Sequence, residues 1–340
     1  MTRNRMTRLS VLALCVLAML FAVAPAATAQ TTPDASGAQG DFAGLVDIGG
    51  RKMYLECSGQ GSPTVVLVAG AGSSARYWTD DLSAQSPPRT MVFPRIAATT
   101  RVCAYDRPGT YASVGDQDFV SRSDPVPQPS TFMAAVTDLH SLLQAAHVPG
   151  PYVLAGHSNG GFISRMYAST HPDEVIGMVL LDAYSEFLEP VFGPKLWPKL
   201  VKFNASQSKA VQIPGYGEAE TVPYASGDDQ MRQLTKTSPL RPMPLAVLAH
   251  GKPFVLPKDP KLSQGITSKV AEPLLLKANQ AQAKLVPDAR FFYAEKSGHN
   301  IHQDQPALSA EAIQQVVAGV RSPDTWYSLQ TCCREAKETP

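Results

Sequence analysis

The 340-residue sequence has no excess of charge of either sign, because 30 Lys and Arg residues face 29 Asp and Glu residues. Three of the basic residues, Arg3, Arg5 and Arg8, lie at the extreme N-terminus, so the rest of the chain is slightly acidic. A protein that binds nucleic acid usually carries a basic patch that neutralises phosphates. The composition therefore excludes the usual electrostatic signature of a nucleic-acid partner.

The sequence is also too poor in glycine and proline to be a fibrous or low-complexity chain. It has 24 Gly and 29 Pro residues, whereas 44% of its residues are hydrophobic. That apolar content is enough to build a buried core, which excludes disorder, collagen and a simple coiled coil. No internal repeat and no linker divides the sequence, so we expect one large domain.

Only one long apolar run is present, from Val11 to Ala24, between the three N-terminal arginines and the small residues Ala27-Thr28-Ala29. This order is typical of a secretory signal peptide. We predict that residues 1–29 are cleaved after Ala29 and that residues 30–340 form a secreted or periplasmic domain with no stable membrane insertion. The alternative is a retained anchor, but the run is shorter than the ~20 residues that span a bilayer.

Cysteines are few, and an exported chain changes how they are interpreted, because an oxidising compartment favours disulfides. Cys57 ends the strand-like run 52–57 and Cys103 lies in the similar run 100–105. We predict a Cys57–Cys103 disulfide between neighbouring strands, with two separate buried thiols as the alternative. Cys332 and Cys333 have no assigned partner.

Between residues 42 and 183, short β-rich runs alternate with segments of helical periodicity, which indicates a largely parallel sheet covered by helices. This alternation of strands and helices is lost over about residues 184–243, where prolines interrupt the chain. We interpret this segment as an inserted lid. The alternation then resumes to the last helix. The expected strands are 45–48, 52–57, 64–68, 101–105, 152–155, 176–181, 245–249 and 290–294, and the clearest expected helices are 132–146, 270–285 and 306–320.

Gly156-His157-Ser158-Asn159-Gly160 matches G-x-S-x-G at a predicted turn from strand to helix. Such a turn needs small residues beside the serine, and it projects the hydroxyl above the sheet at a helix N-terminus. The helix dipole there favours a developing oxyanion. We therefore predict Ser158 as a nucleophile; the alternative is a helix N-cap.

A serine nucleophile needs a base, and His299 is the best candidate because it follows a late strand and precedes the final helix. His302 is the nearest rival. His250 ends the penultimate strand and could line the pocket, whereas His140, His147 and His171 lie on or near covering helices. His157 flanks the nucleophile and is expected to point away from it.

Five segments together resemble the α/β-hydrolase superfamily: the run from Thr64 to Trp78, the turn Tyr105-Asp106-Arg107-Pro108-Gly109, the elbow at Ser158, the run 179–183 and Ser297-Gly298-His299. The likeness covers Leu45 to Arg321 except the lid. It implies an eight-stranded, mostly parallel sheet with an antiparallel first hairpin at one edge, helices on both faces and an inserted helical lid. It also implies a Ser158 nucleophile, a His299 base, and second and fourth strands that are neighbours.

The sequence departs from this family at two positions. Ala69 stands where the loop after the third strand usually opens with histidine, but an oxyanion hole uses backbone N–H groups, which we assign to Ala71 and Asn159. After the seventh strand the family commonly carries an aspartate, whereas this chain reads Gly251-Lys252-Pro253-Phe254. We expect Asp182, at the end of the sixth strand, to replace it, with Asp259 as the alternative acid and Glu186 as a further one.

The expected function is hydrolysis of a small-molecule carboxylic ester through an acyl-enzyme on Ser158, with no metal or organic cofactor. An amidase or peptidase using the same triad is one alternative, and a non-catalytic binding protein with this fold is another. An apolar cluster after Asp182 is expected to roof the site and favour an apolar group, although packing inside the lid is an equal alternative. Candidate substrate contacts are Gly70, His157, Phe187 and Trp197.

Overall fold

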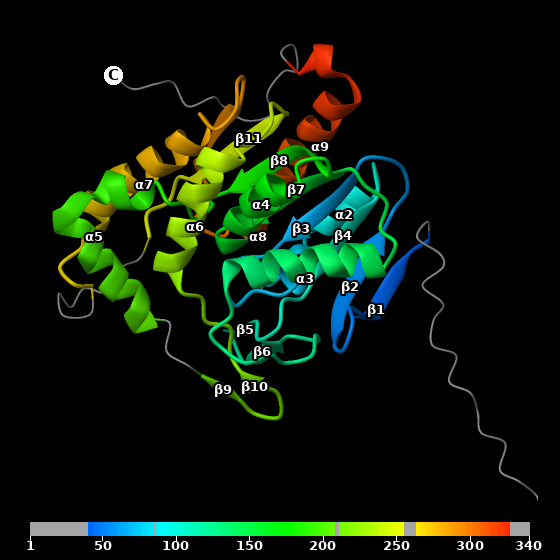
Figure 1. Ribbon diagram of the computed structural model, residues 1–340, viewed down its shortest axis with the longest axis horizontal. Helices are drawn as coiled ribbons and strands as arrows, with labels where there is room; N and C mark the ends of the chain where they lie inside the picture. The colour runs from blue at the N-terminus through cyan, green and yellow to red at the C-terminus, as the bar shows by residue number, and fades with distance from the viewer. Residues whose placement is uncertain (1–39, 84–85, 208–210, 255–262, 327–340) are drawn as a thin grey trace, which may run out of the picture. The chain divides into compact units, whose positions relative to one another are not determined.

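The computed structural model describes residues 40–83, 86–207, 211–254 and 263–326, and it has an eight-stranded sheet at its centre (Figure 1). The strand order is β1-β2-β4-β3-β7-β8-β11-β12. β2 runs antiparallel to both β1 and β4, and every other neighbouring pair is parallel. The strands are β1 (Phe42–Asp47), β2 (Lys52–Ser58), β3 (Thr64–Val68), β4 (Val102–Tyr105), β7 (Tyr152–His157), β8 (Val175–Leu181), β11 (Leu245–His250) and β12 (Arg290–Ala294). This is the predicted α/β-hydrolase fold, with the antiparallel hairpin at the predicted edge.

Helices cover both faces of the sheet because its central strands are apolar on both sides. Val66 and Val68 of β3 pack in one core with α3 (Phe132–Ala145), α4 (Asn159–Thr170) and α6 (Tyr224–Thr237). Val65 and Leu67 pack in a second core on the other face, since successive strand residues point to opposite faces. That face is covered by α1 (Arg76–Thr79), α2 (Val92–Ala97) and α9 (Pro306–Arg321).

The predicted disulfide lies between strands β2 and β4. Cys57 and Cys103 face each other in the antiparallel register, and their sulfur atoms are 2.07 Å apart. The predicted contact between the second and fourth strands is therefore confirmed, and it is this contact that brings the two cysteines together. Cys332 and Cys333 lie outside the described residues, as do the predicted signal peptide and Asp259.

The segment predicted as a lid lies between β8 and β11, two strands that are neighbours in the sheet. It holds α5 (Leu188–Gln207), a hairpin of β9 (Gln212–Ile213) and β10 (Gly217–Glu218), and α6. Gly193 has φ 69° and ψ 177°, which kinks α5 into two parts. In Figure 1, α5 lies beside α7 (Ser268–Gln282), and the two helices share a small apolar core. The role of this segment as a lid stays a prediction.

Four further elements complete the described chain. A hairpin of β5 (Tyr111–Val114) and β6 (Gln117–Val120) follows β4, and the sequence pattern does not predict it. α8 (Ile301–Asp304) and a 3₁₀ turn (Pro323–Thr325) flank α9. Within the described ranges, the chain has no helix whose length and apolar character would let it cross a membrane.

Candidate active site

Ser158 lies at the sharp turn between β7 and α4, with φ 52° and ψ −123°. A non-glycine residue rarely adopts a positive φ, so this backbone is strained and is held by its surroundings. A Cβ atom at Gly156 would collide with the Gly160 backbone, and one at Gly160 would collide with the Val68 carbonyl. Glycine is therefore required on both sides of the serine, as the motif predicts.

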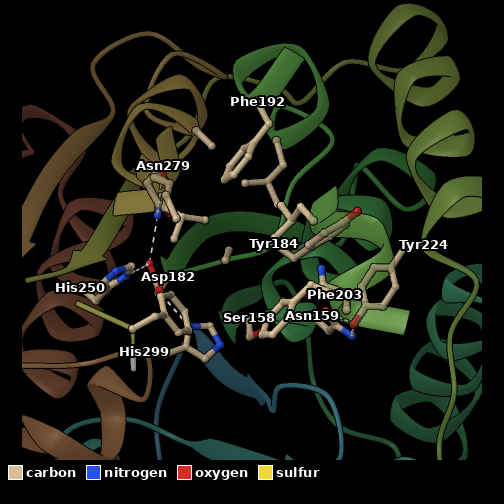
Figure 2. Close-up of a pocket in the computed structure, with 18 of the residues that line it drawn as sticks. Ser158, Asn159, Asp182, Tyr184, Phe192, Phe203, Tyr224, His250, Asn279 and His299 are labelled. Atoms are coloured by element: carbon tan, nitrogen blue, oxygen red, sulfur yellow. Dashed lines mark hydrogen bonds and ion pairs between the residues drawn. The ribbon is translucent and has the colours of Figure 1, made fainter. Parts of the chain in front are cut away.

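Ser158 opens onto a cavity of about 270 Å³ at the carboxyl ends of the parallel strands (Figure 2). Asp182 and His299 line the same cavity, together with His250 and Asn279. Most of the remaining wall is apolar and comes from α5, from α7 and from the turn before α7: Leu188, Phe192, Leu200, Phe203, Ile266, Ala271, Leu275 and Ala278. A nucleophile candidate, an imidazole and a carboxylate thus converge on one largely apolar chamber.

The imidazole of His299 is held by Asp182, through a hydrogen bond of 2.6 Å between Nδ1 and Oδ2. His299 follows β12 and Asp182 follows β8, so the bond passes across the end of β11, which lies between them. In Figure 2 the opposite edge of the His299 ring faces Ser158. This is the arrangement in which an acid orients an imidazole toward a hydroxyl.

Asp182 is buried, with 6% of its surface exposed, and it accepts hydrogen bonds from more than one side. Burial raises the pKa of its carboxyl, but the hydrogen bonds from His250 and His299 outweigh burial and hold that pKa well below its usual range. The carboxylate is therefore ionised at neutral pH and can stabilise a positive charge on His299.

Of the other two acid candidates, Glu186 is engaged elsewhere. Both of its carboxylate oxygens accept hydrogen bonds of 2.8 Å from the Arg165 guanidinium, in a buried pair. The structure therefore does not bring Glu186 to His299. Asp259 falls in the 255–262 range, outside the described residues.

His250 also reaches Asp182, from the end of β11. Its Nδ1 lies 2.8 Å from Asp182 Oδ1, and its Nε2 lies 2.8 Å from Glu272 Oε2 on α7. Burial lowers the pKa of this imidazole, but the two carboxylates outweigh burial and raise the pKa to about 9. His250 lines the cavity as the sequence predicts, whereas the roles of Glu272 and Asn279 are not apparent from the sequence. Both are polar side chains on α7, whose sequence also holds other polar residues, so nothing local marks these two.

His302, the rival base, lies behind the site and does not line the cavity. It is fully buried, and its ring centroid lies 4.4 Å from both the Trp78 and His157 rings. Burial and the neighbouring His299 lower the pKa of His302 to about 3. His157 is buried as well, and burial holds its pKa well below the ordinary value. Its Nε2 lies 3.0 Å from the backbone oxygen of His299.

Because of these two buried histidines, we expect the folded protein to lose stability as the pH falls. Their pKa values are lower in the folded chain than in the unfolded chain, so the stability they confer is complete above about pH 6.5 and is lost as the pH falls. Each is expected to reduce the free energy of unfolding by about 2 kcal/mol between pH 7 and pH 5. Urea unfolding at the two pH values measures this loss. His302→Met, which keeps an apolar volume but cannot titrate, should lose about half of it; an unchanged pH dependence would contradict the prediction.

The two predicted oxyanion donors lie on either side of the elbow. Asn159 is the first residue of α4, so its N–H has no partner within the helix, and Asn159 lines the cavity. Ala71 is exposed and is not among the residues that line the cavity. Gly70, the residue before it, packs so closely that a Cβ atom there would lie 3.2 Å from Ser158 Cβ.

Arg107 fixes the loop that carries Ala71. Its guanidinium donates to the carbonyls of Ala69 and Gly70, at 2.7 and 2.6 Å, and is paired with Glu220, which also accepts the Gly72 N–H. Since the C=O and N–H of one trans peptide point in opposite directions, the Ala71 N–H points away from Arg107. The Tyr105–Gly109 turn, recognised only as a family motif, thus holds the loop beside the nucleophile.

None of the four expected substrate contacts lines the cavity, so those expectations need correction. Gly70 packs against His157 and Ser158, and His157 is buried. Phe187 and Trp197 do not line the cavity; they pack against the small apolar core shared by α5 and α7. The Phe187 ring also lies 5.4 Å from the Arg165 guanidinium carbon. Leu188 and Phe192 line the cavity instead, and their spacing of four residues places them on one face of α5. The spacing of apolar residues in the sequence did not show which face of α5 would point toward the cavity.

Comparison with known proteins places the chain in a family. Residues 65–312 match the model of the Alpha/beta hydrolase family, and the chain belongs to that family. Its match to an uncharacterized protein of Schizosaccharomyces pombe is 34% identical over 151 residues, which is 39% of this chain and 26% of that protein. The Bacillus subtilis protein YqjL is 26% identical over 260 residues, covering 76% of this chain and 85% of its own length.

The chain spans only 26%, 21% and 41% of the length of three of the curated relatives it matches. Among solved structures, carboxylesterase CesB (YbfK) from Bacillus subtilis superimposes with a TM-score of 0.50 at 17% identity. That superposition covers 82% of this chain and 92% of the esterase. It supports the shared fold, and the family membership supports a hydrolase.

Proposed function

We propose that this protein is an exported serine hydrolase that cleaves carboxylic esters, with Ser158 as nucleophile, His299 as base and Asp182 as the acid that orients it. The observation that carries the proposal is the 2.6 Å bond between His299 and Asp182 in the cavity onto which the strained Ser158 opens. The N-terminal sequence pattern supports export.

In the proposed reaction, the Ser158 oxygen attacks the ester carbonyl while His299 takes its proton. Asp182 stabilises the resulting imidazolium, and the Asn159 and Ala71 N–H groups bind the negative charge that develops on the carbonyl oxygen. His299 then gives the proton to the leaving alcohol, and an acyl group remains on Ser158. Water, activated by the same imidazole, releases the acid and restores the serine.

The cavity wall favours an apolar acyl or alcohol group. Its apolar side chains come from both α5 and α7, and burying an apolar chain against them is favourable at roughly 25 cal/mol per Å². An ester also suits the site because an alkoxide leaves more readily than an amide nitrogen, so it demands less of the general acid. We therefore infer that esters with apolar acyl chains are turned over faster than matched amides.

A series of p-nitrophenyl esters from acetate to decanoate, compared with the matching p-nitroanilides, tests this function. Turnover of the esters is expected to exceed that of the anilides at every chain length, and kcat/KM is expected to rise with chain length before the cavity is filled. Faster hydrolysis of the anilides would favour an amidase, and no turnover by folded protein would favour a binding protein.

Leu200→Trp is expected to shorten the chain-length preference. Leu200 lines the cavity from α5, so a larger side chain takes the volume that a long acyl group needs. We expect kcat/KM for decanoate to fall by about tenfold or more, with acetate little affected. The matched control is Val201→Trp, at the next residue of the same helix, which is exposed and outside the cavity wall. Equal losses for both esters in Leu200→Trp would contradict the assignment.

A further inference from the structure

The Asp182 carboxylate is shared by two imidazoles. His299 binds one oxygen at 2.6 Å, and His250 binds the other at 2.8 Å. Asn279 on α7 donates a further hydrogen bond of 3.0 Å to the oxygen that His250 uses. The Asp182 and His250 side chains are both only 4% exposed, so these contacts are largely shielded from water. Figure 2 shows the two rings on either side of the carboxylate.

His250 must carry both ring protons in this arrangement. One of its nitrogens faces the Asp182 carboxylate and the other faces the Glu272 carboxylate, and an ionised carboxylate only accepts hydrogen bonds. An imidazole that donates from both nitrogens is an imidazolium. A buried cation therefore stands across Asp182 from His299, with its charge offset by Glu272.

We propose that His250 and Glu272 are positioning residues that set the basicity of His299 through the Asp182 carboxylate they share. The proposal rests on the proposed function, because it concerns the base of that reaction. The positive charge of His250 partly neutralises the negative charge of Asp182. A proton on His299 is therefore stabilised less than it would be beside Asp182 alone. Glu272 acts in the opposite direction, because its negative charge favours that proton.

Among the described residues, the other titratable groups near this cluster are two buried histidines and Asp304, whose Oδ2 accepts a 2.7 Å hydrogen bond from the Gly298 N–H beside His299. His157 and His302 lie behind His299, and burial keeps both neutral at neutral pH. Of the described residues, the ionisable groups that face His250 are thus Asp182 after β8, Glu272 from α7 and, across Asp182, His299 after β12. Removing one charge from this set should change the proton affinity of His299 in a direction fixed by the sign of that charge.

The test is the pH dependence of the rate at which a fluorophosphonate modifies Ser158, a readout that needs no knowledge of the natural substrate. The rate should rise as His299 loses its proton. In His250→Gln the cation is gone and both carboxylates remain, so the rise should shift to higher pH by about one unit. In Glu272→Gln the His250 cation stays beside Asp182, but the negative charge of Glu272 is gone. His299 therefore holds its proton less tightly, and the rise in rate should shift to lower pH.

The opposite directions separate this role from a structural one. If both variants merely loosen the site, the maximal modification rate falls but the pH at which the rate rises does not change, or it changes in the same direction in both variants. Either result overturns the proposal. His147→Asn, which changes an exposed histidine that does not line the cavity, is the matched control and should not shift the rise.

Glu272→Gln keeps the test decisive if His250→Gln does not fold, because the Glu272 side chain is partly exposed. A rise moved to lower pH in that variant supports the proposal, and an unmoved rise overturns it. Failure of the proposed function would look different, since wild-type protein would then leave Ser158 unmodified at every pH.

Discussion

Ser158→Ala should abolish ester hydrolysis, with a fall in kcat on the order of 10⁶, because no other group in the cavity can take the place of the attacking oxygen. Removing the nucleophile of a Ser-His-Asp hydrolase costs about this much, and the remaining rate comes from substrate binding and the oxyanion hole. The variant should fold, since alanine fits a strained turn that serine already occupies.

Steady-state hydrolysis of p-nitrophenyl butyrate by wild type and variant measures the effect. Ser226→Ala is the matched control, because Ser226 is exposed on α6 and lies outside the cavity wall. It should retain wild-type activity. Substantial activity in Ser158→Ala would mean that the hydrolytic chemistry uses another residue.

Asp182→Asn is the second change with a large expected effect, a fall in kcat of about 10⁴-fold. The amide has nearly the shape of the carboxylate, but it carries no charge and stabilises neither the correct ring tautomer nor the imidazolium of His299. The same substitution leaves His250 without one of the two carboxylates that keep it charged. We therefore also expect a lower melting temperature, which thermal unfolding would detect.

Asp259→Asn is the matched control for this prediction, since Asp259 was the other aspartate considered for the acid. It should leave kcat unchanged. An inactive Asp259→Asn beside a normal Asp182→Asn would show that the acid is Asp259 and that the Asp182–His299 contact is not used in catalysis. The fluorophosphonate reaction of each folded variant separates a loss of activity from a loss of fold.

Much of the scaffold is predictable from the sequence because its signals are local. The apolar run Thr64–Val68 and the run Arg290–Ala294 become β3 and β12 with the expected bounds, since each is a short β-rich stretch flanked by turn residues. The turn at Ser158 was predictable for the same reason, because its glycines are required by contacts within a few residues and with the adjacent strand.

Other features depend on contacts between distant segments, which no local pattern encodes. The hairpin β5–β6 has short strands without a strong apolar alternation, so the sequence showed no strand there. Phe192, four residues after Leu188 on the same helix face, lines the cavity, whereas Phe187 and Trp197 do not. Glu272 was missed because its role depends on α7 docking beside His250, 22 residues earlier in the chain.

The geometry around the cavity also explains how Asp182 could act as the acid, although the family commonly places that aspartate after the seventh strand. In this chain the end of that strand, β11, carries His250, whose ring contacts the Asp182 carboxylate. Asp182, the proposed acid, follows β8, the strand next to β11, and its Oδ2 lies 2.6 Å from His299 Nδ1. The run 251–254, where the family commonly has an aspartate, has none, and the preceding residue His250 contacts the Asp182 carboxylate instead.

The central claim, that residue 158 is a serine activated by the imidazole at 299, is tested most directly by treating folded protein with a fluorophosphonate and mapping the adduct by tandem mass spectrometry. The account predicts one phosphonyl group per chain, located on Ser158, and a much slower reaction in His299→Gln. Protein that stays unmodified, carries the group on another residue, or reacts equally fast without His299 would contradict it.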